Sequence, residues 1–208
     1  MIRPLLFLSL SLALLGATAS AKEKPAHPDY QLREGDIVFQ GNPGLQSDAV
    51  RAATDSPYTH CGVVVETRDG LAVFEAIHPV RVTRLEDFIA RSLPGTFHAR
   101  RLNQALDPAW VDQARKWAEQ QNGKPYDSLF AWSDDSMYCS ELVWKLYRAG
   151  GVELCKPRPF REYRLDEPAV KTIIDQRYGG KANLPLDEPA VAPSDLAASS
   201  YLVEVPRK

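Results

Sequence analysis

Two apolar segments joined by a short turn constrain the fold more than any other feature of this chain. Residues 59–66 (THCGVVVE) are rich in β-branched side chains, and residues 71–76 (LAVFEA) continue that character after Thr-Arg-Asp-Gly at 67–70. β-Branched and aromatic residues favour strands, and a polar, glycine-containing stretch between two such runs favours a turn. The pattern predicts an antiparallel hairpin, and therefore a fold built on an antiparallel sheet.

The predicted hairpin brings a histidine close to a carboxylate. With residues 67–70 as the loop, position 62 faces Glu75, so His60 lies one diagonal step from Glu75 on the same face. Positions related in this way are roughly 7 Å apart, close enough for long side chains to hydrogen-bond. Cys61 points to the opposite face and is expected in the core. The alternative is that both polar side chains face solvent, since one face of an antiparallel sheet is often wet.

The remaining periodic segments predict helices around this sheet. Further strands are expected at 37–39, 80–82, 96–102 and 200–205, and helices at 45–53, 85–91, 108–121 and 138–149. Pro108 suits the first position of its helix, and the glycine pair at 150–151 suits the end of the last one. Helices packed around a mainly antiparallel sheet make an α+β fold.

One of these helices begins beside a cysteine. The acidic pair at 134–135 leads into Ser136, the expected N-cap, and Cys139 follows within the first turn. Free backbone N–H groups and the helix dipole there favour the thiolate, the form that attacks carbonyl carbon. Cys139 is therefore a candidate nucleophile, with His60 as its base and Glu75 orienting the imidazole. The alternative is a small buried residue on an amphipathic helix.

The first residues of the chain have the pattern of a secretory signal peptide. A basic residue precedes an apolar run at 5–15, and Ala-Ser-Ala at 19–21 offers a cleavage site. The run is too short to span a bilayer, so a retained anchor is the weaker alternative. We expect residues 1–21 to be removed, 22–31 to form a flexible leader and 32–208 to form one domain, exported to the periplasm.

Composition excludes several classes of partner. Loss of the signal leaves 24 Lys and Arg against 27 Asp and Glu, a formal charge of −3. That balance predicts neither nucleic-acid binding nor a membrane-surface patch, and no second apolar run predicts a membrane span. Cys61, Cys139 and Cys155 are too few for a disulfide scaffold, although a Cys61–Cys155 disulfide stays open. A zinc site at His60, Cys61 and Cys139 is disfavoured because adjacent strand residues point apart. The oligomeric state stays open.

Two motifs resemble a known family. Gly-Lys-Pro-Tyr-Asp at 123–127 and Tyr-Cys-Ser-Glu-Leu-Val at 138–143 resemble the nucleophile region of NlpC-type papain-fold cysteine peptidases. In ordinary members the cysteine precedes the histidine, whereas here residues 32–39 and 59–64 supply the histidine first. That order resembles the circularly permuted branch, the YiiX-type papain-like amidases, which are related to the lecithin:retinol acyltransferase group. The resemblance covers residues 32–150.

The resemblance implies a small antiparallel barrel-like sheet with the nucleophile helix packed on it. It implies Cys139, His60 and Glu75 as the catalytic triad, and no cofactor. Tyr126 is similar to a tyrosine near the nucleophile of the ordinary branch, where it could help the Cys139 backbone N–H to bind the oxyanion. Tyr126 could equally be a core aromatic residue. Tyr58 is a candidate wall residue on the face of His60.

The expected function is an exported cysteine hydrolase that cleaves amide bonds through a thioester acyl-enzyme. Its substrate is expected to be a cell-envelope peptide or an N-acyl or lipid-linked amide. One alternative is a lipid acyltransferase or thioesterase that uses the same site, and another is a non-catalytic envelope binding module. A large apolar groove beside Cys139 would favour acyl transfer with a lipid, and a narrow polar cleft would count against it.

Overall fold

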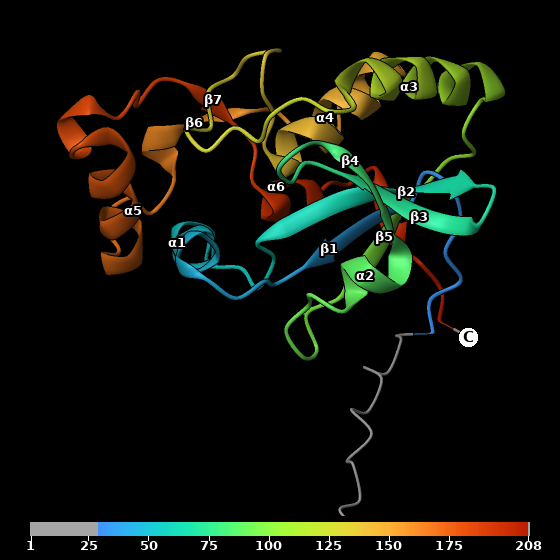
Figure 1. The fold of residues 1–208 in the computed structure, drawn as a ribbon, viewed down its shortest axis with the longest axis horizontal. Coiled ribbons are helices and arrows are strands. Elements are labelled where there is room, and N and C mark those ends of the chain that lie inside the picture. The colour runs from blue at the N-terminus through green and yellow to red at the C-terminus, as the bar shows by residue number, and fades with distance from the viewer. Residues whose placement is uncertain (1–28, 208) are drawn as a thin grey trace, which may run out of the picture.

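Six antiparallel strands form the centre of the protein, in the order β4-β3-β2-β1-β5-β8 (Figure 1). The computed structural model describes residues 29–207, so the predicted signal peptide and residues 22–28 of the leader lie outside the described residues. The six strands are β1 (Ile37–Gln40), β2 (His60–Thr67), β3 (Gly70–Glu75), β4 (Arg81–Arg84), β5 (His98–Leu102) and β8 (Leu202–Glu204). The α+β class and the antiparallel sheet are as predicted.

Helices cover both faces of the sheet. On one face α3 (Pro108–Gln121) and α4 (Cys139–Ala149) pack over a core that includes Phe39, Val63 and Leu142 (Figure 1). On the other face α2 (Leu85–Ile89) places Phe88 against Val38 and Val64. Alternate residues of β1 and β2 therefore enter two different cores, because neighbouring residues of a strand point to opposite faces.

A third apolar cluster lies to one side of the sheet (Figure 1). Here α1 (Leu45–Thr54) packs on α5 (Pro168–Tyr178) through Ala49, Val170 and Ile173. The proline-containing tail also forms β6 (Arg158–Pro159), β7 (Pro189–Ala190), α6 (Pro193–Ala197) and two short 3-10 helices at Phe160–Glu162 and Lys181–Asn183. The sequence pattern did not predict α5, which becomes important at the site below.

The hairpin has the predicted register but a shorter turn. Val63 pairs with Phe74 and Glu66 with Leu71, as expected, and the ladder continues to a Thr67–Gly70 pair. Only two residues, at 68–69, therefore make the turn, where four were predicted. Gly70 has a φ of 107°, a conformation that glycine adopts without strain. The register is unchanged because both strands lengthen by one residue.

Two boundaries differ from those predicted. The predicted flexible leader ran to residue 31, but Tyr30 is buried and bridges to Arg207, and the N–H of Gln31 donates to the carbonyl of Pro206. Pairing with the C-terminal segment therefore holds the end of that leader. The helix α4 is capped by Tyr138 and not by Ser136, because the chain stays extended up to Tyr138.

Between residues 29 and 207, no helix has both the length and the apolar character needed to cross a bilayer.

Candidate active site

A buried chain of polar groups starts at the first residue of β2. The Nε2 atom of His60 lies 2.6 Å from Oε2 of Glu75, and Oε1 of Glu75 accepts a hydrogen bond of 2.6 Å from Nη2 of Arg91. Glu75 is fully buried, and His60 is 6 % exposed. The predicted diagonal contact between His60 and Glu75 is confirmed. Arg91 is an addition from the segment after α2, and no pattern in the sequence connected it to Glu75.

A glycine makes room for this contact. Gly62 faces Glu75 across the hairpin, and a Cβ at position 62 would lie 2.9 Å from the carbonyl oxygen of Phe74 and 3.2 Å from Cβ of Glu75. Such distances leave no space for a side chain beside the backbone of β3. Position 62 must therefore lack a side chain if His60 is to reach Glu75 across the hairpin.

An aromatic residue of α2 covers the polar chain. The ring of Phe88 lies 5.6 Å from the His60 ring between centroids, and the Arg91 guanidinium lies 5.4 Å from the centre of the same ring. The contact with Phe88 shields the His60–Glu75 pair from water and adds a cation–π interaction for Arg91. Electrostatic interactions in such a dry site are stronger than in solvent.

Cys139 is the first residue of α4, where the helix meets the start of β2. It is 4 % exposed and belongs to the same core cluster as the fully buried Cys61. The prediction that Cys61 is a core residue is confirmed. Its position beside Cys139 was not foreseen, because strand alternation describes the two faces of β2 but not which helix end lies over them. All three cysteines are free, so the Cys61–Cys155 disulfide that the sequence left open is not formed.

The surroundings lower the pKa of Cys139 and raise the pKa values of His60 and Cys61. A hydrogen bond from Cys61 lowers the pKa of Cys139, burial opposes it, and the charge and hydrogen bond of His60 lower it further, to well below the usual thiol value. Burial alone would lower the pKa of His60, but Cys139 and then Glu75 outweigh it and raise this pKa to about 9. Burial, followed by Cys139, raises the pKa of Cys61. A Cys139 thiolate beside a His60 imidazolium is therefore the favoured state.

The Tyr-Cys-Ser-Glu motif holds the tail of the chain against the nucleophile helix. Oε2 of Glu141 accepts a 3.3 Å hydrogen bond from the backbone N–H of Tyr138, which closes the first turn of α4. The Ser140 hydroxyl donates to the carbonyl of Val191 over 2.6 Å, and the Val191 N–H donates to the Tyr138 hydroxyl over 3.1 Å. The motif therefore also positions residues 190–192 beside Cys139.

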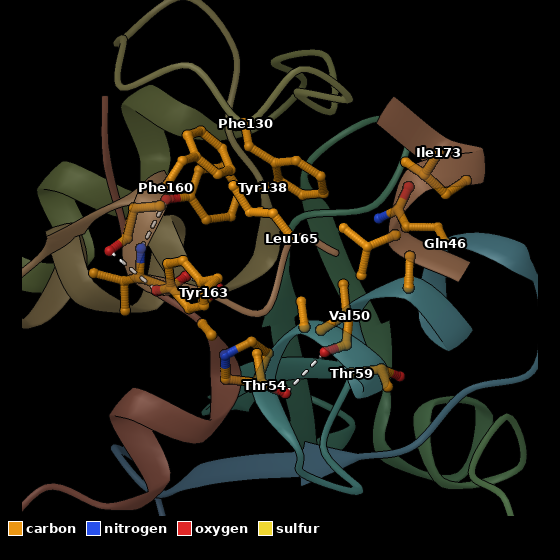
Figure 2. Close-up of a pocket in the computed structure, with 18 of the residues that line it drawn as sticks. Gln46, Val50, Thr54, Thr59, Phe130, Tyr138, Phe160, Tyr163, Leu165 and Ile173 are labelled. Atoms are coloured by element: carbon orange, nitrogen blue, oxygen red, sulfur yellow. Dashed lines mark hydrogen bonds between the residues drawn. The ribbon is translucent and has the colours of Figure 1, made fainter. Parts of the chain in front are cut away.

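An apolar pocket opens next to Cys139. Figure 2 shows Phe130, Tyr138 and Phe160 on one side of it and Val50 and Ile173 on another. Its walls come from α1, from α5 and from the segments around residues 130, 160 and 190. The sequence reasoning missed most of these residues, since they are scattered along the chain and come together only when α1 packs on α5.

Tyr126 lies in the wall of this pocket, close to Cys139. Its hydroxyl accepts a 2.7 Å hydrogen bond from Nε2 of Gln46. Arg177 of α5 donates in turn to the Gln46 side chain, and to the carbonyl of Ser128 over 2.6 Å. Burial and then the charge of Cys139 raise the pKa of Tyr126 well above its usual value, so its phenol keeps its proton. That proton is available to an acceptor near Cys139.

Tyr58 does not occupy the predicted position. It precedes β2, and its ring stacks on His98 at 5.7 Å and packs against Phe39 at 5.5 Å. Thr59, the next residue, lines the pocket instead. The prediction for Tyr58 was wrong because it extended the alternation of β2 two residues beyond the start of the strand.

Known proteins resemble this chain over most of its length. "Uncharacterized protein YiiX" of Escherichia coli (strain K12) is 36% identical over 180 residues, which cover 86% of this chain and 88% of that protein. A crystal structure from Escherichia coli O157:H7, described as that of metalloprotein yiiX, matches with a TM-score of 0.80 and 37% identity over 86% of this chain and 99% of that chain. Within residues 29–207 of the present chain, no group of three or more His, Cys, Asp or Glu side chains is placed to hold a metal ion.

The family assignment rests on a match that covers most of the chain. The model of the family described as "Permuted papain-like amidase enzyme, YaeF/YiiX, C92 family" matches residues 31–205. This range contains His60, Glu75 and Cys139 in the permuted order. The resemblance seen in the sequence motifs is confirmed, and the chain belongs to the permuted papain-like amidase family.

Proposed function

We propose that this protein is an exported cysteine amidase in which Cys139 is the nucleophile, His60 the general acid and base, and Glu75 the residue that orients His60. One observation supports this most: Cys139 is the first residue of α4 and lies close enough to His60 for each to shift the pKa of the other, and Nε2 of His60 is held 2.6 Å from the buried carboxylate of Glu75. With Nε2 of His60 bound to Glu75, Nδ1 is the nitrogen that serves the thiol. This arrangement has the nucleophile, base and orienting group that acyl-enzyme chemistry requires.

Acylation begins from the thiolate–imidazolium pair. The Cys139 thiolate adds to the carbonyl carbon of the amide, and the π electrons move to the carbonyl oxygen. The backbone N–H of Cys139, which has no partner within its own helix, and the Tyr126 hydroxyl are the donors for that oxyanion. The C–N bond then breaks while His60 gives its proton to the departing amine, which leaves a thioester on Cys139.

Deacylation uses the same groups in reverse order. Neutral His60 removes a proton from water, and the resulting hydroxide adds to the thioester carbon. The C–S bond breaks, the carboxylic acid leaves and Cys139 returns to its thiolate beside imidazolium. Glu75 stays ionised throughout, because burial, which would raise its pKa, is outweighed by His60 and Arg91, which lower it.

The test is selective alkylation of the mature protein by iodoacetamide, read by peptide mass spectrometry. Cys139 should react first, because thiolates react and its pKa is lowered, whereas burial raises the pKa of Cys61 and, to about 12, that of Cys155. Amide hydrolysis should be lost in Cys139→Ala by about 10⁴-fold and kept in Cys155→Ala. Equal, slow labelling of all three thiols, or hydrolysis that survives Cys139→Ala, would remove the proposal.

Acyl transfer is the second candidate, and the apolar pocket beside Cys139 favours it. The two reactions differ only in whether water or another nucleophile resolves the thioester. Adding an alkyl alcohol or alkyl amine to a running hydrolysis separates them. Acyl transfer predicts that the new ester or amide replaces the carboxylic acid at low acceptor concentration, and hydrolysis predicts that the acid stays the main product.

A further inference from the structure

Glu141 is a buried carboxylate that the proposed reaction steps do not use. It is the third residue of α4 and is fully buried, and its Oε2 accepts the hydrogen bond from the Tyr138 N–H described above. Its Oε1 lies 2.9 Å from Nζ of Lys145, one turn further along the same helix. A buried charge is unfavourable unless it is paired, and a glutamine could accept the same hydrogen bond without a charge. The bond from Tyr138 therefore does not explain why this residue is ionisable.

Lys145 connects Glu141 to the loop that leads into α4. Its Nζ donates to the carbonyl of Ser133 over 2.6 Å and to Oδ1 of Asp134 over 2.8 Å. Only 13 % of the Lys145 side chain is exposed, so the ion pair with Glu141 lies largely outside solvent. The pair therefore joins the first turn of α4 to two residues of the loop that precedes Cys139 in the chain.

That first turn carries groups that must meet the amide with accuracy. The sulfur and the N–H of Cys139 both belong to it, whereas His60 is held by the sheet. A displacement of about 1 Å in such a site can reduce a rate about 10²-fold. The start of a helix is held less firmly than its middle, because its first N–H groups have no partners within the helix. A buried ion pair at this place restricts the movement of the turn.

The charge of Glu141 changes close to neutral pH. Burial raises its pKa to about 7, although Lys145 and then the Tyr138 N–H lower it, and the charge of Asp127 raises it. Asp127 is itself buried, whereas Asp134, which meets Lys145, is largely exposed. The Tyr138 phenol stays neutral, because burial and then the charge of Glu141 raise its pKa well above the usual value. Below about pH 7, Glu141 therefore takes up a proton and its ion pair with Lys145 is lost.

We infer that Glu141 is a positioning residue for Cys139: its ion pair with Lys145 holds the first turn of the nucleophile helix against the loop before it. This inference rests on the proposed function and adds a control of the same site by pH. When Glu141 is neutral, the Tyr138 N–H keeps its acceptor, so the turn loosens but stays in place. The rate should fall about tenfold as pH falls through about 7 and then level off, before the complete loss in stronger acid.

The test compares Glu141→Gln with the wild type on p-nitrophenyl acetate, which passes its acetyl group to Cys139 and releases p-nitrophenol. At about pH 8 the variant should be about tenfold slower, at about pH 5.5 the two rates should meet, and the variant should show no step between them. Alkylation of Cys139 by iodoacetamide needs the thiolate but no alignment with a carbonyl, so its rate should change less than about twofold. A variant that keeps the step, or that matches the wild type at about pH 8, overturns the inference, while selective alkylation still supports the proposed function.

Variants of the two neighbours locate the effect. Lys145→Met should be as slow as Glu141→Gln, the double variant should be no slower than either, because both changes remove one ion pair, and Lys145→Arg should restore the rate. Asp127→Asn removes the charge that raises the Glu141 pKa but keeps an acceptor for the Leu129 N–H, so the step should move to lower pH. Arg148→Met, an exposed change on the same helix, is the control and should leave the step in place. Additive losses, or an equal shift in the control, overturn the inference.

Thermal unfolding separates positioning from a general loss of structure. The folded-state pKa of Glu141 lies above its ordinary value of 4.5, so its contribution to stability is complete below that value and is lost as pH rises towards about 7. The thermal midpoint of Glu141→Gln should therefore gain on that of the wild type over this range, while its rate falls behind. A midpoint that falls behind together with the rate would make the ion pair a structural one and overturn the inference.

Discussion

The surroundings of Cys139 are charged on one side and apolar on the other. On the side of the sheet, His60, Glu75 and Arg91 form a continuous chain of charged hydrogen bonds that is largely closed to water. On the side of α1 and α5, the wall is mostly hydrocarbon, and none of the described residues that line it is Asp, Glu, Lys, Arg or His. A thioester formed at Cys139 would lie at the border between them. The charged side is suited to moving protons, and the apolar side to selecting what is bound.

The two sides also come from different parts of the chain. The charged side is contained in residues 60–91, which form a hairpin, an edge strand and a short helix. The pocket combines α1 with segments after residue 126, and the Tyr138–Val191 and Ser140–Val191 hydrogen bonds help to join the segment around residue 191 to the nucleophile helix. We therefore expect changes on the charged side to affect rate and its pH dependence, and changes on the apolar side to affect substrate preference.

The largest effect is expected from Glu75→Gln. An amide at this position keeps the shape but not the charge, so it can bind His60 in the wrong tautomer, and kcat/KM should fall by about 10³- to 10⁴-fold. Because Glu75 also helps to raise the pKa of His60 to about 9, we expect the wild type to lose activity as pH rises through that value and the variant to lose it at a lower pH. The measurement is a pH–rate profile for both proteins. Glu66→Gln, an exposed change on the same hairpin, is the control, and an equal loss there would contradict the assignment.

A smaller effect on activity, confined to acid pH, is expected from Arg91→Met. The pKa of Glu75 lies below its ordinary value of 4.5, so ionised Glu75 stabilises the fold above its unfolded-state pKa, and this contribution is lost as pH falls through the folded-state pKa. Removing Arg91 raises that folded-state pKa, so activity and the thermal midpoint should start to fall at a higher pH. At neutral pH activity should stay close to wild type, whereas the thermal midpoint should already be lower, because the variant has lost the share of the Glu75 contribution that Arg91 supplied.

Arg81→Met is the control for this variant. Arg81 pairs with Glu75 in the β3–β4 ladder but is exposed. Removing Arg81 should not change the pH at which activity starts to fall in acid, the acid limb of the pH–rate profile. If the two substitutions shift that limb equally, a general change in surface charge explains the effect and the ion pair with Arg91 does not.

The smallest effect is expected on the apolar side, from Gln46→Leu. The leucine fits an apolar wall but cannot donate to the Tyr126 hydroxyl, which then loses its fixed orientation towards the carbonyl oxygen. One neutral hydrogen bond predicts a fall of about two- to tenfold in kcat, with KM for acyl substrates unchanged or lower. Steady-state kinetics with Ser47→Ala as the control measures it. A fall above 10³-fold would instead make Tyr126 the main oxyanion donor.

Local rules were sufficient to predict the His60–Glu75 contact on the charged side of the site. Period-two alternation and a turn at 67–70 predicted the register of β2 and β3, and that register alone placed His60 on a diagonal to Glu75. Helix-end chemistry likewise placed Cys139 in the first turn of α4, although the capping residue was misplaced by two positions. These predictions depended on contacts between residues that are near one another in sequence or are paired by a short hairpin.

The apolar side could not be predicted in this way. The residues of the pocket wall at positions 46–54, 126–138 and 160–193 show no pattern that relates them, and α5 was not predicted at all. Arg91 and Cys61 were missed for the same reason, since their roles depend on which helix end lies beside which strand. Side-chain packing between distant segments decides that arrangement, and no short stretch of sequence records it.

The sequence by itself determined the hairpin register, the nucleophile at a helix start, and the permuted order of a papain-like amidase. It could do so because strand and helix periodicities are local properties of the backbone. Only the tertiary structure decided what surrounds Cys139: a buried ion pair that reaches Arg91 on one side, and an uncharged pocket between α1 and α5 on the other. Those features depend on burying apolar surface between segments that are as much as 131 residues apart, as Gln46 and Arg177 are, and burial is a property of the whole fold.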